Sequence, residues 1–498
     1  MSYLAHSTSS LKTTRTIGQG TIRDESQRQS SAHAASIHVL DDDSLLIIFY
    51  LNRPAIFDVD DDRDDRFLGG KGWDREQWWY KLAQVCQRWR QLILGSASYL
   101  GLCLVCTYGT RVADMLAHSP PLPLVIDYFH EDRDIIAEEE EIFVALEQRD
   151  RIRRVRLNLP FPNLQNLIMA IDEEYPVLEY LIMAHSSEDS STALMFPDTF
   201  QAPHLRHVML LGFALPIGSR SLTTVVGMVT LSLSMYHPFQ PDTLLQWISF
   251  MPQLETLLIL SDNNCDMERQ LLHAPIVTHV TLPNLRFIEF QGGIAYMEAI
   301  ICQITTPRLQ KLVIHLPWQF TLSVPPLLQF IKATESLRFD SAKVVLAGDD
   351  EVYVEVYPLE EAETYALSIH VYCRQLDWQV SSVARIINSL SQISSTVEHL
   401  TLKHKVNSRL SEEYDMVDCT VWHELLRSFG NVKTLHVDDG LVKELSRGLR
   451  LDDGELPLEL LLELQELTYS GSGNADAFTS FIEARQNAGR PVTLIRHS

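Results

Sequence analysis

The residues best suited to chemistry in this chain are few and widely spaced. Cys103 and Cys106 form its one Cys-x-x-Cys pair, and His399 and His404 lie five positions apart. A structural zinc ion needs a second pair of ligands at suitable spacing, and none follows these cysteines. In an extended segment the two thiols point to opposite faces, so we predict buried cysteines in a strand. His399 and His404 do not share a helical face.

Two further segments have compositions that suggest ligand binding. The run from Asp58 to Asp65 contains six aspartates, but no register places the glycine and glutamate of a calcium loop at positions six and twelve. We expect a solvated, mobile acidic loop instead. The cluster Gly69–Gly72 lacks the spacing that cradles phosphate. Hydrolase and nucleotide-binding motifs are also missing, which predicts a protein that is not an enzyme and uses no cofactor or metal. An enzyme stays open as a minor alternative.

Composition and charge limit the classes of partner. The 498-residue chain carries a formal net charge of −24 and has a pI of about 5.1. Such a chain is repelled by phosphate backbones and anionic lipid, so we expect neither nucleic-acid nor membrane binding. No apolar run approaches a membrane span, and the N-terminus lacks an apolar signal region. Seven scattered cysteines favour a reducing compartment, the cytoplasm or the nucleus.

The elements near the N-terminus are expected to be short amphipathic helices. Asp41 or Asp42 can cap a first helix that runs to Leu51. Asp74, with Gln77 three positions later, forms a capping-box arrangement for a second helix that runs to about Ile93 and stops at Gly95. Helices of this size cannot bury their large apolar side chains alone, and they therefore need a partner surface.

The residues in these helices resemble an F-box. That family combines an apolar Leu-Leu-x-x-Ile-Phe helix with a Val-Cys-x-x-Trp-Arg signature. The segments that follow, 99–110 and 121–126, resemble F-box proteins of mushroom-forming fungi. The resemblance implies that a Skp-family adaptor would bind the matching positions: Leu45, Leu46, Ile48, Phe49, Leu51, Leu82, Val85, Cys86, Trp89 and Arg90. An ordinary amphipathic helical hairpin is the alternative.

From about residue 122 one short pattern recurs, apolar-x-x-apolar-x-apolar, often after a proline. Copies begin at Ile152, Leu178, Leu205, Met228, Leu254, Leu285, Leu309, Val397, Val432 and Leu464, with weaker ones at 337–339 and 367–369. Their steps of about two to three dozen residues overlap the leucine-rich-repeat range and partly exceed it. The segments between copies, such as 244–250, 326–331 and 422–429, have helical patterns.

A strand-plus-helix unit of this kind buries its core only by stacking on its neighbours. We therefore predict an α/β fold in which a helical F-box precedes an irregular leucine-rich-repeat solenoid, with a parallel sheet and helices on its outer face. A doubly wound α/β domain is the alternative. The predicted divisions are a disordered tail over 1–36, a helical domain over 37–108 with an acidic insertion at 53–72, and the solenoid over 109–498.

The strand face opposite the core is the expected target site. The third, fifth and seventh residues of each copy point away from the core. In early copies they form an apolar stripe of Tyr180, Ile182, Met209, Leu211, Leu258, Leu260 and Phe287. In late copies they are polar and rich in histidine: Lys311, His315, His399, Thr401, Lys403, Thr434, His436 and Asp438. An exposed apolar stripe of that size would mark a binding surface.

The resemblance implies one function and leaves one alternative open. The implied function is the substrate-recognition subunit of an SCF-type (cullin-RING) ubiquitin ligase, whose F-box binds the adaptor–cullin assembly and whose repeats bind an unknown protein target. The alternative is a leucine-rich-repeat interaction scaffold in which the F-box-like helices only cap the solenoid. An apolar patch left exposed on the helices favours the first function, and a patch buried on the repeats favours the second.

Overall fold

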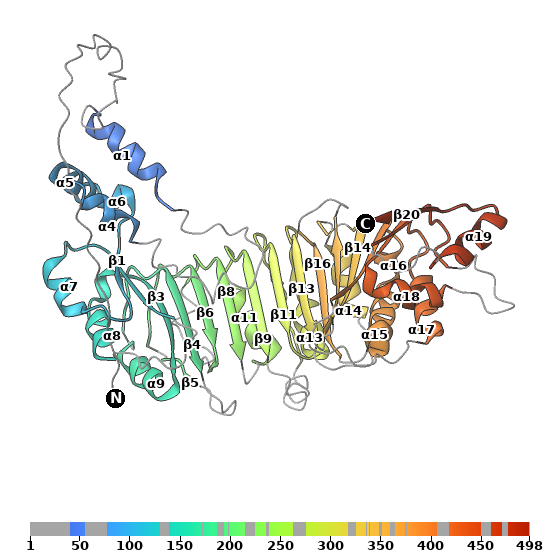
Figure 1. Ribbon diagram of the computed structural model, residues 1–498. Coiled ribbons are helices and arrows are strands. Elements are labelled where there is room, and N and C mark those ends of the chain that lie inside the picture. The colour runs from blue at the N-terminus through green and yellow to red at the C-terminus, as the bar shows by residue number, and fades with distance from the viewer. Residues whose placement is uncertain are drawn as a thin grey trace, which may run out of the picture.

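The protein forms one long row of strands with helices along one side, and a small group of helices stands at its N-terminal end (Figure 1). The computed structural model describes residues 40–54, 77–129, 139–171, 173–186, 194–197, 199–214, 225–235, 239–261, 275–316, 325–334, 336–337, 339–347, 351–358, 364–373, 376–405, 418–449, 460–470 and 477–497. The predicted tail over 1–36, the acidic run, Gly69–Gly72 and Asp74 lie outside these ranges. Within the described ranges, no helix is both long enough and apolar enough to cross a membrane.

We name the group at the N-terminal end the helical module. It comprises four helices: α1 (Asp42–Leu51), α4 (Trp78–Ala83), α5 (Gln87–Gly95) and α6 (Ala97–Leu100). Asp41 caps α1 by accepting a hydrogen bond from the Ser44 amide at 2.7 Å, as predicted. The prediction of a single second helix up to Ile93 is wrong, because the helix is interrupted between α4 and α5. At the break Cys86 adopts an extended conformation, and its Sγ accepts a hydrogen bond from the Trp89 amide.

One sheet of sixteen strands, counted over the described residues, makes up the rest of the fold. Its order is β1-β2-β3-β4-β6-β8-β9-β11-β13-β16-β15-β14-β17-β18-β19-β20. The bounds are β1 Leu104–Cys106, β2 Leu124–Tyr128, β3 Ile152–Pro160, β4 Tyr180–Ser186, β6 His207–Leu211, β8 Thr230–Met235, β9 Thr256–Ser261, β11 Phe287–Gln291, β13 Lys311–Leu316, β14 Ser341–Ala347, β15 Glu351–Tyr357, β16 Leu367–Tyr372, β17 His399–Lys405, β18 Thr434–Val437, β19 Glu466–Ser470 and β20 Thr493–His497. The first strand therefore begins a few residues before the predicted boundary at 109.

Helices cover one face of this sheet. They are α7 Val112–His118, α8 Glu139–Leu146, α9 Phe161–Ala170, α11 Pro241–Ile248, α13 Ile294–Ile301, α14 Pro325–Ala333, α15 Leu376–Ser389, α16 Ser391–Ser394, α17 Cys419–Arg427, α18 Asp439–Gly448 and α19 Thr479–Asn487. The three helices predicted between repeat copies are confirmed as α11, α14 and α17. Two small pairs, β5 Leu194–Met195 with β7 Phe213–Ala214 and β10 Val280–Thr281 with β12 Ile304–Thr305, lie outside the main sheet.

The recurring sequence pattern explains how the units stack. Its first residue is buried just before each strand, and its fourth and sixth residues face one continuous apolar core, as Leu181 and Met183 do on β4. Each fully buried aliphatic side chain contributes about 1.5 to 3 kcal/mol. The second residue extends the hydrogen-bonded ladder beyond the strands, because the Arg206 amide bonds to the Glu179 carbonyl and the Lys433 amide to the Glu398 carbonyl. The predicted strand-and-helix solenoid is therefore present.

The sheet departs from the expected parallel order at β14 to β16. Strand β15 runs antiparallel to both β14 and β16, and β16 rather than β14 pairs with β13. At the weak copy over 337–339 the described residues Leu337 and Phe339 are not in a strand and β14 begins only at Ser341, whereas the copy at 367–369 opens β16. A connection of a few residues between β14 and β15 permits only an antiparallel pair. The expectation of a wholly parallel sheet is therefore wrong at this point.

Candidate functional site

Two surfaces carry the residues predicted to bind partners: the helical module and the strand face of the solenoid that is opposite the helices. In the helical module, Leu45, Phe49 and Ile93 are fully or almost fully buried, and Trp89 is 9% exposed. The rings of Phe49 and Trp89 meet edge to face with centroids 4.9 Å apart. These residues therefore hold α1 against α5.

Polar contacts fix the same pair of helices. The Arg88 guanidinium donates two hydrogen bonds to Oδ1 of Asp42, at 2.7 and 2.9 Å, and one to the Leu40 carbonyl at 2.7 Å. On the other side of the module, Trp79 is buried and its Nε1 donates to the Cys103 carbonyl at 3.2 Å, just before β1. Through this contact the helical module also covers the first strand of the sheet.

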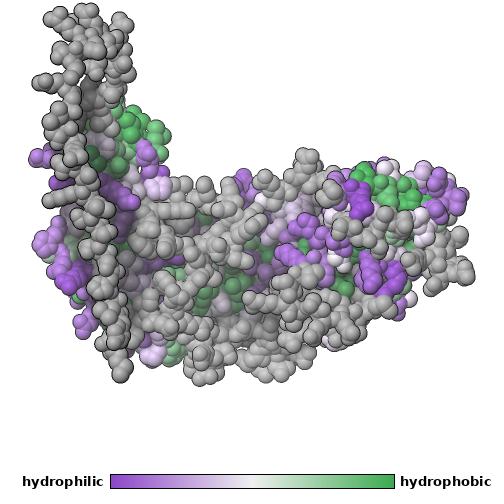
Figure 2. Space-filling view, viewed as in Figure 1, coloured by the Kyte–Doolittle hydropathy of each residue, from purple (hydrophilic) through white to green (hydrophobic). Residues whose placement is uncertain are grey.

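The outward side of the helical module is apolar. We name as the apolar patch a set of large hydrophobic side chains that are each more than a third exposed: Ile47, Ile48, Tyr50, Leu51, Val85 and Tyr99. Tyr50 and Tyr99 bring α1 and α6 together, with ring centroids 5.3 Å apart. Figure 2 shows hydrophobic residues gathered over the helical module.

The structure separates the predicted adaptor-binding residues into three groups. Leu45, Phe49 and Trp89 lie in the core of the module, so they cannot form the contact surface that their motif positions predicted. Ile48, Leu51 and Val85 belong to the apolar patch, at 37%, 75% and 58% exposed. The others are exposed or intermediate: Arg90 is exposed, and Leu46, Leu82 and Cys86 are half-buried. The exposed Ile47, Tyr50 and Tyr99 were not predicted.

The early half of the strand face is not the exposed apolar stripe that the sequence predicted. Ile182, Met209 and Leu258 are only 3%, 5% and 6% exposed. Parallel strands lie about 4.8 Å apart, so side chains in register shield one another. The remaining members, Tyr180, Leu211, Leu260 and Phe287, are half-buried. Tyr180 stacks on His207, with centroids 4.4 Å apart.

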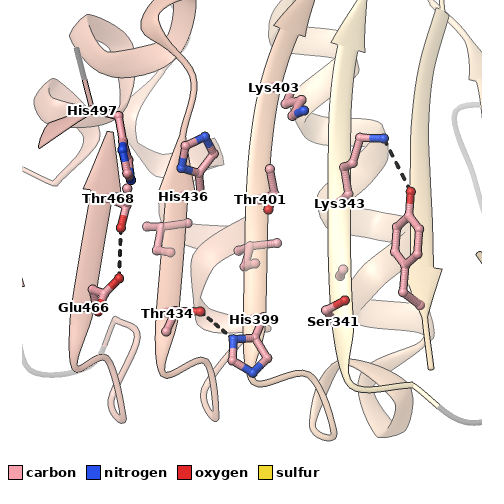
Figure 3. A pocket seen from close by; sticks show the side chains of 14 residues that line it. Ser341, Lys343, His399, Thr401, Lys403, Thr434, His436, Glu466, Thr468 and His497 are labelled. Atoms are coloured by element: carbon pink, nitrogen blue, oxygen red, sulfur yellow. Dashed lines mark hydrogen bonds between the residues drawn. The ribbon is translucent and has the colours of Figure 1, made fainter. Parts of the chain in front are cut away.

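The late half of the strand face contains a hollow of about 530 Å³. We name it the histidine hollow. It brings together the predicted residues His399, Thr401, Lys403, Thr434 and His436 with residues that were not predicted, among them Lys343, Tyr357, Glu466, Thr468 and His497. Figure 3 shows the labelled side chains on neighbouring strands, pointing out of the same face. In sheet order the lining residues come from β15, β14, β17, β18, β19 and β20. Lys311 and His315 lie outside the hollow, on β13.

Hydrogen bonds hold many of these side chains. Nδ1 of His399 and Oγ1 of Thr434 are 2.7 Å apart, and Thr468 donates to Oε1 of Glu466 at 3.1 Å. Burial, then the positive charges of Lys403 and His497, holds the pKa of His436 below its ordinary value. His436 is therefore neutral at pH 7, and the hollow presents lysine cations together with at least this one neutral imidazole. Such a lining can recognise acidic and hydrogen-bonding groups.

A third group of polar side chains lies on β11, β13, β15 and β16. Nδ1 of His370 contacts Oε1 of Glu351 at 2.8 Å, and its Nε2 contacts Oγ of Ser368 at 2.9 Å. This serine–histidine–carboxylate order resembles that of a hydrolase triad. However, Ser368 is completely buried, so a substrate carbonyl could not reach its oxygen. Glu351 and His370 were not predicted as site residues, although the strict alternation of residues 351–357 is a strand signal that includes Glu351.

The two cysteines of the Cys-x-x-Cys pair lie as predicted. Both are buried, Cys106 in the main core and Cys103 in a small cluster with Val105 and Val125 on the other face of the sheet. Burial raises the pKa of the Cys106 thiol to about 12. That thiol is protonated at neutral pH and is not available as a thiolate ligand.

Comparisons with solved structures find repeat proteins at low similarity. They include the TLR13–ssRNA13 complex, with TM-score 0.30, 12% identity, and coverage of 79% of this chain and 48% of that one. They also include the leucine-rich-repeat-containing protein LegL7 from Legionella pneumophila, with TM-score 0.26, 13% identity, and coverage of 61% of this chain and 82% of that one. A leucine-rich-repeat protein of Leptospira interrogans matches with TM-score 0.27, 11% identity, and coverage of 79% of this chain and 88% of that one.

This chain thus spans about half the length of the first of these structures. No protein-family model and no curated protein matches the chain. At these TM-scores the likenesses carry no inference about function. The fold is a mixed α/β solenoid with a large, mostly parallel sheet.

Proposed function

We propose that this protein is the substrate-recognition subunit of an SCF-type ubiquitin ligase. In this proposal the helical module binds a Skp-family adaptor, and the solenoid holds a protein target. The protein catalyses no reaction itself. It raises the effective concentration of the target near a charged ubiquitin-conjugating enzyme, which increases the rate of transfer without any new chemistry. Such a complex would work in the cytoplasm or the nucleus.

The observation that carries the proposal is the apolar patch. A helical module that served only as a cap would turn its large apolar side chains inward. Here Leu51, Val85 and Tyr99 are each more than half exposed, although the module already has a packed interior around Phe49 and Trp89. Clustered exposed apolar residues typically mark a protein-binding surface, and aromatic anchors dominate such interfaces. These residues lie within or beside the segment that resembles an F-box.

The proposed target site is the histidine hollow. Its side chains come from six neighbouring strands and are held in place by the sheet, which suits the recognition of an extended segment of a partner. Lys403 would attract carboxylates, and His399 and His436 would supply hydrogen bonds. The protein target is therefore expected to present an acidic segment to this face.

A second candidate function is a repeat-based scaffold without a ligase role. The contact of Trp79 with the Cys103 carbonyl favours it, because a solenoid needs a cap on its terminal repeat. The two functions differ in what they expect of the apolar patch: the ligase subunit uses it to bind the adaptor, and the scaffold does not.

Adaptor binding tests the proposal directly. The full chain, co-expressed with a Skp-family adaptor, should co-purify with it at equal stoichiometry. The double variant Leu51→Asp/Val85→Asp should weaken binding at least tenfold, because each change places a charge in a desolvated apolar contact. Met169→Asp, at a 76% exposed position on α9, is the matched control and should bind like the parent.

The outcomes separate the two functions. Loss of binding in the double variant alone, with an unchanged circular-dichroism spectrum, supports the ligase subunit. Absence of binding by the parent chain, or equal binding by the double variant, rejects it and leaves the scaffold. In a second arm, His399→Asp should still bind the adaptor but capture fewer acidic targets. If it captures the same targets as the parent, the target site lies elsewhere.

A further inference from the structure

A compact polar cluster lies where the antiparallel strand β15 interrupts the parallel sheet. It contains His315 of β13, His370 of β16 and Glu351 of β15, three strands that are neighbours in the order β13-β16-β15. His315 and His370 are in register, and their rings stack with centroids 4.3 Å apart. One ring nitrogen of each histidine and one carboxylate oxygen of Glu351 all lie within 4.8 Å of one another.

Each histidine has its Nε2 atom engaged by a neighbouring side chain. Nε2 of His315 lies 3.4 Å from Oε1 of Glu289 on β11, and Nε2 of His370 lies 2.9 Å from Oγ of Ser368. The hydrogen bond between Ser368 and Nε2 of His370 can fix the orientation and tautomer of that ring, as such bonds do in metal-binding histidines. With Nε2 in contact with a neighbour in both rings, Nδ1 is the nitrogen left to bind a metal, and in His370 it would exchange its present hydrogen bond with Glu351 for the metal.

The Nδ1 atoms are placed differently from those of ordinary surface histidines. Nδ1 of His315 is buried and has no hydrogen-bond partner. Nδ1 of His370 faces Oε1 of Glu351 at 2.8 Å, so a proton or a cation must lie between these two atoms. A buried polar atom without a partner is destabilising, and a bound ion is one explanation for such an atom.

We propose that His315, His370 and Glu351 bind a divalent transition-metal ion of the Zn²⁺ class. Two neutral imidazoles and one carboxylate are a donor set that zinc accepts, with water in the fourth position. Tetrahedral ligands about 2.0 to 2.1 Å from zinc are about 3.3 Å apart, so the present separations must shorten by up to about 1.5 Å. The two rings, which are stacked here, must also turn so that both nitrogen lone pairs point at the ion.

The metal would act as a clamp in the middle of the solenoid. Its ligands come from two parallel strands and from the antiparallel β15, whose pairing with β16 breaks the repeat. Joining β13, β16 and β15 through one ion would fix the register of this inserted strand against the preceding repeat. Lys343 and Lys405 on β14 and β17 point out of the same face, but they contact Glu355 and Tyr353 rather than Glu351.

A second cluster, formed by Asp340, Glu398 and His399, has similar spacing but weaker support. Glu398 is already paired with Lys433 at 2.6 Å, and Nδ1 of His399 with Thr434. His399 therefore provides the matched control for histidine substitution on the same face of the sheet.

Metal titration of the full chain tests the proposal. The purification tag is removed, bound metal is stripped with a chelator, and Zn²⁺ is titrated by calorimetry. We expect one site per chain, weakened at least tenfold in His315→Ala, in His370→Ala and in Glu351→Gln, and unchanged in His399→Ala. Co²⁺ in place of Zn²⁺ should give the visible absorption bands of low-coordinate cobalt, and these bands should disappear in His370→Ala.

The binding constants decide the outcome. Glu289→Gln, which changes only the partner of His315 Nε2, should weaken Zn²⁺ binding by about tenfold without removing the site. Circular dichroism of each variant shows whether it folds, and His370→Gln replaces His370→Ala if the latter does not. The proposal is overturned if the parent chain binds no Zn²⁺, or if the His315 and His370 variants bind it as tightly as the parent does.

Discussion

Phe49 distinguishes a core residue of the helical module from a residue that contacts a partner. Its side chain is 1% exposed and packs edge to face on Trp89, which joins α1 to α5. Replacing it with alanine removes a buried aromatic ring and leaves a cavity. Large-to-small changes of this kind cost about 3 to 5 kcal/mol, of which the aromatic pair accounts for about 0.5 to 1.5 kcal/mol.

The loss of stability caused by Phe49→Ala should appear in the helical module rather than in the solenoid. The Arg88–Asp42 pair and the Trp89 packing are the main further links between α1 and α5, and the exposed ion pair adds at most about 1 kcal/mol. We therefore expect Phe49→Ala to lower the local opening free energy of α1 and α5 by about 3 to 5 kcal/mol. Hydrogen exchange followed by mass spectrometry, resolved to peptides, measures this change.

Ile47→Ala is the matched control, because Ile47 lies on the same helix and is 53% exposed. It should change the opening free energy by no more than about 0.5 kcal/mol. Peptides from β9 and β13 should exchange at the parent rate in both variants. If amides of α1 and α5 are as protected in Phe49→Ala as in the parent chain, Phe49 does not hold the helices together and our account of the module core is wrong.

Two further predictions concern titratable groups. Burial, then the charges of Arg206 and Arg154, lowers the pKa of His207 from 6.5 to about 4, so between these values the unfolded chain holds a proton that the folded chain lacks. Stability should therefore fall by about 2 kcal/mol as pH drops through that window, after discounting for partial exposure. Urea unfolding at pH 7 and pH 4.5 measures this loss of unfolding free energy. The loss should be smaller in His207→Gln than in the parent chain, and it should equal the parent's loss in the exposed-site control His118→Gln. For the cysteines, iodoacetamide at pH 8 should label the exposed Cys302 at least tenfold faster than the buried Cys106, because burial raises the pKa of the Cys106 thiol to about 12. Equal labelling rates would contradict the burial of Cys106.

The sequence determined the local elements of this protein because their signals lie within a few residues. The pattern that begins at Leu178, Leu205 or Leu254 marks a buried turn residue followed by a two-residue alternation, and strands follow at those places. The caps also depend on local chemistry, as at Asp41. The polar half of the strand face followed from alternation alone, which placed His399, Lys403 and His436 in the histidine hollow.

Only the tertiary structure decided which faces are covered and which strands are neighbours. Alternation cannot tell that Met209 and Leu258 are shielded by adjacent strands, or that Phe49 turns inward while Leu51 turns outward. Strand β15 enters between β14 and β16, and this long-range pairing brings Glu351 beside His370, nineteen residues later in the chain. The physical reason is that burial and strand order depend on contacts between residues far apart in the chain, whereas periodicity reports only the direction in which each side chain points.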